Sequence, residues 1–111
     1  MDKQEQITQA VSDYLNHHRY DPPERDGWFS MWEIKQGVNN ELDFTLRSLH
    51  VLRATDALMA TQPPKVEDVW MLSNSDGTPR LESQYQHPEQ PDKARRFYRV
   101  VSPSVEYIDP S

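Results

Sequence analysis

The hydrophobic periodicity of the chain changes at the Pro63–Pro64 pair, and this change constrains the fold more than any other sequence feature. Before the pair, apolar residues recur three and four positions apart, which is typical of amphipathic helices. After it, residues 66–72 follow a period of two, which is typical of a strand. The sequence therefore predicts an α+β fold in which helices come first and strands follow.

Two helices are predicted in the first 40 residues. The first spans about residues 4–18 and the second, a very short one, residues 31–37. Ser30 and Glu33 have the spacing of a capping box at the start of the second helix, and Gly37 is expected to end it. Apolar side chains on one stripe of the first helix are Ile7, Ala10, Val11, Tyr14 and Leu15.

A third helix is predicted over residues 41–60, after a three-residue turn at 38–40. Asn40 is the expected N-cap of this helix, because its short polar side chain can accept from a free backbone N–H. Its expected core stripe is Leu42, Leu46, Leu49 and Leu52. A projection at 100° per residue places on the opposite, outward side Phe44, Arg47, Ser48, Val51, Ala54, Thr55 and Leu58.

Strands are predicted over about residues 66–73, 80–86 and 95–101, followed by a tail at 102–111. They form either a β-hairpin or a three-stranded wing, because residues 78–92 are compatible with both a strand and a loop. A length of 111 residues predicts one domain, residues 1–111.

The order of helix, short helix, turn, helix and β-hairpin resembles that of the winged helix-turn-helix superfamily, over roughly residues 5–101. This resemblance implies that the third helix enters the major groove of DNA and that the wing contacts the minor groove or the backbone. It implies a small transcriptional regulator that binds double-stranded DNA, expected to be a homodimer.

DNA-binding candidates follow from this layout. Arg47 is the best candidate for base reading, because its guanidinium matches guanine O6 and N7. Other candidates in the turn and third helix are Asn39, Asn40, Ser48, His50 and Thr55, and those in the wing are Arg80, Lys93, Arg95 and Arg96.

The charge distribution favours a second interpretation. The net charge is −6, and residues 1–44 contain nine acidic against four basic residues, which argues against indiscriminate nucleic-acid binding. An apolar seam on the outward side of the third helix, formed by Phe44, Val51 and Leu58, is typical of a protein contact. The alternative function is therefore a protein-interaction module, such as an adaptor, a complex subunit or a phage-type inhibitor, that does not bind DNA.

Enzymatic function is not expected. The chain has no cysteine and only three glycines, and it contains no metal-binding or phosphate-loop motif. We therefore expect no catalytic residue, no metal and no cofactor. The absence of a signal-like N-terminus and of a long apolar run predicts a cytoplasmic protein that does not contact a membrane.

Overall fold

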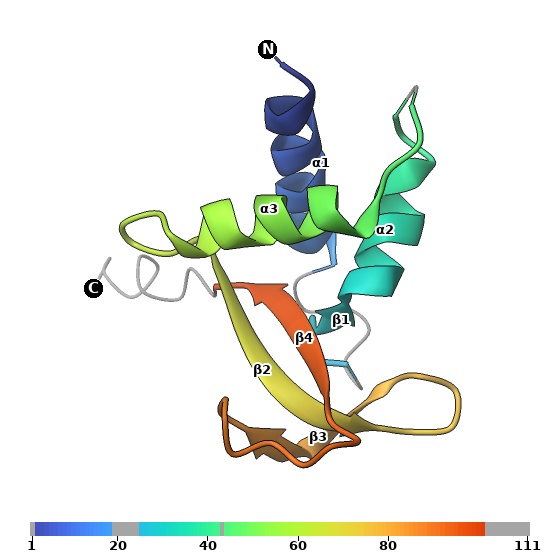
Figure 1. Cartoon of the computed structure of the whole chain (residues 1–111), viewed down its shortest axis with the longest axis vertical. Coiled ribbons are helices and arrows are strands. Elements are labelled where there is room, and N and C mark those ends of the chain that lie inside the picture. Colours follow the sequence, from blue (N-terminus) through green and yellow to red (C-terminus); the bar gives the residue numbers. More distant parts are fainter. Residues whose placement is uncertain (1, 19–24, 43, 102–111) are drawn as a thin grey trace, which may run out of the picture.

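The computed structural model describes residues 2–18, 25–42 and 44–101. These residues form three helices and one four-stranded antiparallel sheet, so the α+β class is confirmed. In Figure 1 the helices occupy the upper half of the molecule and the sheet extends below them. The predicted tail at 102–111 lies outside the described residues, as does Asp43.

Helix α1 (Lys3–His17) agrees with the prediction from its apolar stripe. Asp2 is its N-cap: the Glu5 N–H donates to Asp2 Oδ1 at 2.8 Å, and the Asp2 N–H donates to Glu5 Oε1 at 3.2 Å. The stripe that faces the core contains Ile7, Val11 and Leu15, all buried. These three residues anchor α1 to the rest of the fold.

Strand β1 (Phe29–Ser30) leads directly into helix α2 (Met31–Asn39). The predicted capping box is present, because the Glu33 N–H donates to Ser30 Oγ and the Ser30 N–H donates to Glu33 Oε1. The predicted end at Gly37 is wrong, since α2 continues to Asn39. Gly37 serves packing instead: a Cβ at this position would lie 2.2 Å from Cε1 of Tyr14 on α1.

Helix α3 (Ser48–Met59) begins well after the predicted residue 41, and the predicted three-residue turn is wrong. Asn40 is the C-cap of α2, and Arg47 is the N-cap of α3. Between them the chain is held by the Asn39 side chain, whose Oδ1 accepts from the Leu46 N–H at 3.1 Å. Leu46 is therefore held in the core although it is not part of a helix.

The buried side of α3 is the opposite of the predicted one. Val51, Ala54, Thr55 and Leu58 are buried, whereas Leu49 is 51% exposed and Leu52 is half-buried. Because α3 starts only at Ser48, Leu42 and Leu46 do not share its helical register and therefore do not fix its orientation. The small side chains of Ala54 and Thr55 instead face the interior, where α1 packs against α3.

The sheet contains β1, β2 (Val66–Ser73), β3 (Pro79–Tyr85) and β4 (Arg95–Val100) in the order β1-β4-β2-β3. Residues 79–85 are thus a strand, which selects the three-stranded form of the predicted wing. Phe29 pairs with Tyr98 across β1 and β4, and Val69 pairs with Phe97 across β2 and β4.

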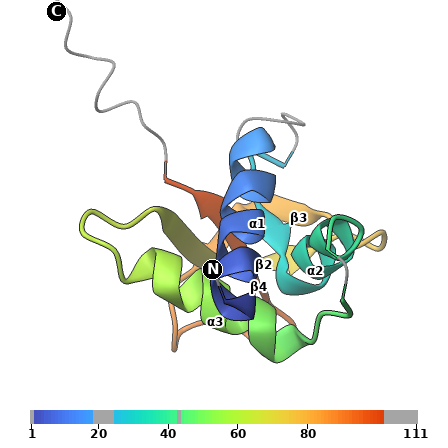
Figure 2. The same cartoon turned by 90° about the horizontal axis from the view of Figure 1, so that it is seen from above.

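The two faces of the sheet contribute to two different hydrophobic clusters. On one face Val66 and Tyr98 pack against the helices, in the main core. On the other face a smaller cluster contains Trp28, Val69, Met71 and Phe97. In both views α3 lies across α1, and α2 stands to one side of them (Figure 1 and Figure 2). Strands β2 and β4 are joined to the helical part through Val66 and Tyr98 in the main core.

Candidate functional site

Three basic side chains line one pocket where β2 ends and β4 begins. Arg80 on β3, Lys93 before β4 and Arg95 at the start of β4 line one open pocket of about 580 Å³. All three side chains are exposed. Asp92 is the acidic residue in the lining. We call Arg80, Lys93 and Arg95 the wing cluster.

The wing cluster holds three positive charges and one acidic neighbour, Asp92. None of the ion pairs found in the described part of the chain involves Arg80, Lys93 or Arg95. Arg80 Nε donates to the neutral side-chain amide oxygen of Asn74 at 3.2 Å, which positions the guanidinium without cancelling its charge. Such a cluster can bind an anion such as a phosphate group.

Arg96 and Arg99, in contrast, are bound by carboxylates. Arg96 Nε lies 2.7 Å from Asp68 Oδ2, and Arg99 contacts Glu67 at 2.7 Å and Asp26 at 2.6 Å. Burial is the largest single effect and lowers the pKa of Arg96, but the hydrogen bond to Asp68 and the nearby negative groups together outweigh it, so the pKa is raised overall. Asp68 thus binds the Arg96 guanidinium in this structure, and a contact between Arg96 and DNA stays a prediction.

The candidates on α3 divide into exposed and buried residues. Arg47 and Ser48 are exposed at the N-terminal end of the helix. His50 is half-buried, and its Nδ1 accepts from the Arg47 N–H at 3.3 Å. Thr55 is fully buried, and its hydroxyl donates to the Leu52 carbonyl at 3.0 Å. The prediction that Thr55 contacts DNA is therefore wrong in this conformation.

The remaining predicted residues also differ in their contacts and exposure. Asn39 uses its side-chain oxygen to hold Leu46, while Asn40 is exposed at the end of α2. The predicted protein-contact seam is wrong, because Val51 and Leu58 belong to the main core. Phe44 is half-buried, and the Lys3 ammonium lies 4.8 Å from the centre of its ring.

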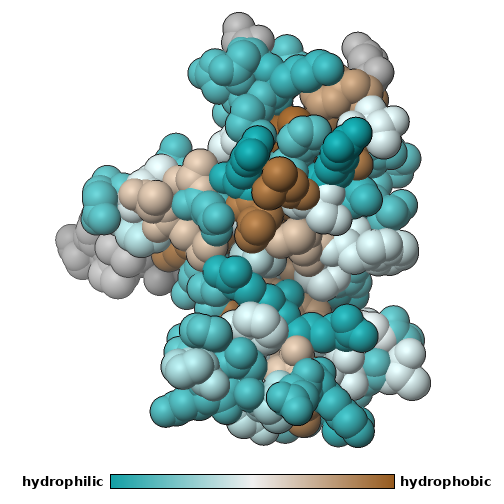
Figure 3. Space-filling model, in the orientation of Figure 1, coloured by the Kyte–Doolittle hydropathy of each residue, from teal (hydrophilic) through white to brown (hydrophobic). Residues whose placement is uncertain are grey.

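Sequence reasoning missed two exposed apolar residues. Leu49 on α3 is 51% exposed, and Trp32 on α2 is 67% exposed. Figure 3 shows hydrophobic surface over α3 with hydrophilic residues around it. Ala54 and Thr55 are the sequence signal that could have predicted which side of α3 is buried. Small side chains favour the side of a helix that another helix approaches closely.

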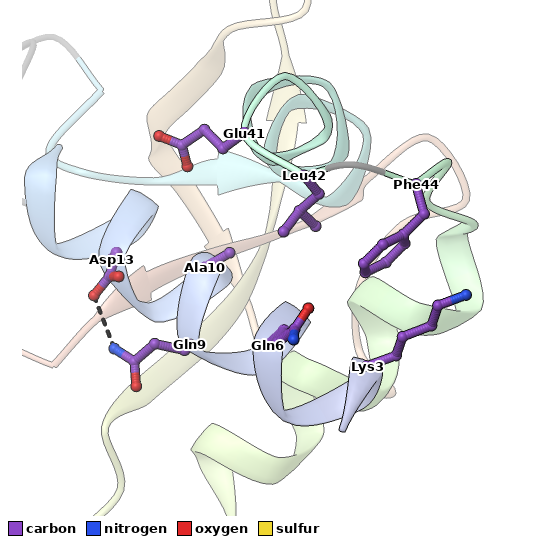
Figure 4. A pocket seen from close by; sticks show the side chains of 8 residues that line it. All are labelled: Lys3, Gln6, Gln9, Ala10, Asp13, Glu41, Leu42 and Phe44. Atoms are coloured by element: carbon purple, nitrogen blue, oxygen red, sulfur yellow. Dashed lines mark hydrogen bonds between the residues drawn. The ribbon is translucent and has the colours of Figure 1, made fainter. Parts of the chain in front are cut away.

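A second open pocket, of about 630 Å³, lies between α1 and residues 41–44. Figure 4 shows Lys3 and Phe44 at one end of this pocket and Asp13 at the other, where Gln9 Nε2 donates to Asp13 Oδ1 at 2.9 Å. Its lining contains both acidic and basic side chains, so the pocket concentrates neither negative nor positive charge. Within residues 2–18, 25–42 and 44–101, no group of three or more metal-binding side chains comes together.

Comparisons with models of protein families, with characterised proteins and with solved structures found no match to this chain. No described helix is long and apolar enough to cross a membrane. The function must therefore be inferred from the chain's own surface. The cytoplasmic location and the single-domain organisation stay predictions.

Proposed function

We propose that this chain is a DNA-binding regulator of the winged-helix type that contacts the phosphate backbone with the wing cluster. The observation that carries the proposal is that Arg80, Lys93 and Arg95 line one pocket and that none of the three forms an ion pair within the described residues. Phosphate contacts by arginine and lysine supply much of the affinity of DNA-binding proteins. The proposed role involves no catalytic step.

The element order supports the same proposal. Helices α2 and α3 are followed by the β2–β3–β4 wing, and β1 pairs with the last strand of that wing. Arg47 and Ser48 are exposed at the N-terminal end of α3, the end that reads base edges in the superfamily that the sequence resembles. Because the net charge is −6, we expect binding that depends on sequence and on salt concentration.

Fluorescence anisotropy with a pool of randomised DNA duplexes, at low and at near-physiological salt, tests the proposal. Replacing Arg80, Lys93 or Arg95 by Gln should weaken binding to all sequences, and each replacement should reduce the salt slope by about one because it removes one phosphate-binding charge. Lys65→Gln is the matched control, since Lys65 is an exposed, unpaired lysine outside the wing cluster.

The variant Arg47→Ala separates base reading from backbone contact. It should relax the sequence preference of the selected duplexes while leaving the salt slope nearly unchanged. Absence of duplex binding at low salt, or equal affinity of wild type and all three wing variants, would refute the proposal.

The exposed apolar residues support a second candidate function. Trp32 and Leu49 are large, exposed side chains on neighbouring helices, and tryptophan is enriched in protein interfaces. If DNA binding fails, we propose a protein-interaction module. Crosslinking through a photoreactive amino acid placed at position 32 or 49 would then identify the partner.

A further inference from the structure

Two pockets meet at the start of β4. The pocket of the wing cluster and a second open pocket, of about 310 Å³, share the lining residues Ser73 and Arg95. The second pocket lies between the start of α2 and the turn that joins β2 to β3, below α2 in Figure 1. Trp32 and Asn74 also line it, and Asn74 Oδ1 accepts from Arg80 Nε at 3.2 Å. The positive charges of the wing cluster therefore border a pocket that contains an indole ring.

Trp32 offers an open aromatic surface in this second pocket. It is 67% exposed, and within the described ranges it belongs to neither hydrophobic cluster. The other two tryptophans are more enclosed, since Trp28 is buried and Trp70 is half-buried beside the ring of His87. Because a side chain gains hydrophobic free energy only when it is buried, Trp32 contributes little to the fold and its ring is available to stack on a ligand.

The acidic residues around the two pockets leave a small excess of positive charge. The Glu33 carboxylate forms an ion pair with Arg25. The Asp76 carboxylate accepts from the N–H and the hydroxyl of Thr78, at 3.0 and 2.6 Å. The three positive charges of the wing cluster thus face two acids that form no ion pair in the described ranges, Asp76 and Asp92. This balance suits a ligand with one phosphate group that also gains affinity from the indole ring.

We propose that the two pockets together bind one unpaired nucleotide of a DNA strand, with its base stacked on Trp32 and its phosphate held by Arg95 and the rest of the wing cluster. Aromatic rings that stack on bases beside cations that hold phosphates are typical of sites for single-stranded nucleic acid. Inside a duplex each base is already stacked on both sides, so the indole can stack only on a base that has left the duplex. The adjacent cations favour a nucleotide over an apolar protein segment.

This inference rests on the proposed function, because it uses the same wing cluster, and it adds a preference for DNA that has an unpaired stretch. Fluorescence anisotropy of the full chain, with a blunt duplex and with the same duplex carrying a short single-stranded overhang, measures this preference. The wild type should bind the overhang duplex more tightly by about fivefold to 150-fold, the range expected for stacking of one base.

Variants of Trp32 connect the preference to the indole ring. Trp32→Ala should remove the preference and leave the affinity for the blunt duplex unchanged, whereas Trp32→Phe should retain part of it. Leu49→Ala is the matched control, since Leu49 is an exposed apolar side chain outside both pockets, and it should keep the full preference. Arg95→Gln should weaken binding of both duplexes. Circular dichroism verifies that these exposed substitutions leave the fold intact.

The outcomes separate this inference from the proposed function. Equal affinity of the wild type for the two duplexes, or a preference that survives in Trp32→Ala, would overturn the inference and leave the proposed function standing. Binding of the overhang duplex alone, lost in Trp32→Ala, would support the inference and refute the duplex-binding regulator. No binding of either duplex at low salt would overturn both. Displacement of the overhang duplex by an equimolar nucleoside monophosphate would assign the pockets to a free nucleotide and would also overturn the inference.

Discussion

Gly37 allows a direct test of how α1 and α2 pack. An alanine Cβ at position 37 would lie 2.2 Å from Cε1 and 2.8 Å from Cζ of Tyr14, far inside ordinary van der Waals contact. The Tyr14 ring would therefore have to retreat by about 1 Å or more. It is held in place by Phe29, at 5.5 Å between ring centres, and by His18, at 4.7 Å.

Two opposing effects set the size of the change. Alanine in a helix interior is favoured over glycine by about 1 kcal/mol. Overfilling a packed site costs about 1–3 kcal/mol. We therefore expect Gly37→Ala to lower the free energy of unfolding by up to about 2 kcal/mol in the wild-type background. In a Tyr14→Ala background the same change should raise it by up to about 1 kcal/mol, because only the helix preference remains.

Urea denaturation of the wild type, both single variants and the double variant measures this coupling. Comparison of Ala and Gly at Gln36, the exposed neighbour on α2, gives the helix preference without the ring contact. The pKa of Tyr14 is a second readout: burial and the nearby Glu33 carboxylate raise it, and displacement of the ring should lower it. If Gly37→Ala stabilises both backgrounds equally, the close contact between α1 and α2 does not exist.

Two further predictions concern local polar contacts. Ser30→Ala removes the acceptor of the Glu33 N–H and should destabilise the chain by about 1 kcal/mol, as measured by urea denaturation. Equal stability of Ser30→Ala and wild type would contradict that capping role. Hydrogen bonds from Thr78 lower the pKa of Asp76, so Thr78→Val should raise it in a carboxyl NMR titration. Because the folded pKa is the lower one, the stabilisation is present above the ordinary carboxyl pKa and is lost as the pH falls through the lowered value. An unchanged Asp76 pKa would disprove the contribution of the hydroxyl.

The elements predicted from strong local signals agree with the structure. The apolar stripe of α1, the capping box of α2 and the strand periodicity of β2 and β4 all depend on residues near one another in the sequence.

The orientation of α3 could not be predicted in the same way. Both sides of the helix contain apolar residues, with Leu49 and Leu52 on one and Val51 and Leu58 on the other. Which side is buried depends on where the helix starts, and the segment before it contains a hydrogen bond between Asn39 and Leu46, which are distant along the chain and not detectable as a local pattern. The sequence also does not tell which arginines form ion pairs. The carboxylates that bind Arg96 and Arg99 are distant in sequence, on β2 and near β1, so the arginines without an ion pair could not be told apart from them.

The position of β4 determines when the chain can complete its sheet during synthesis. β4 lies between β1 and β2, although it is the last of the described strands to leave the ribosome. β2 and β3 can form a hairpin as soon as they emerge, but Phe29 has no strand to pair with until Tyr98 has been translated. Contacts this distant in sequence form slowly. A nascent chain that ends before residue 95 would expose the apolar sides of its helices, and a premature stop there would remove the middle of the sheet rather than an edge.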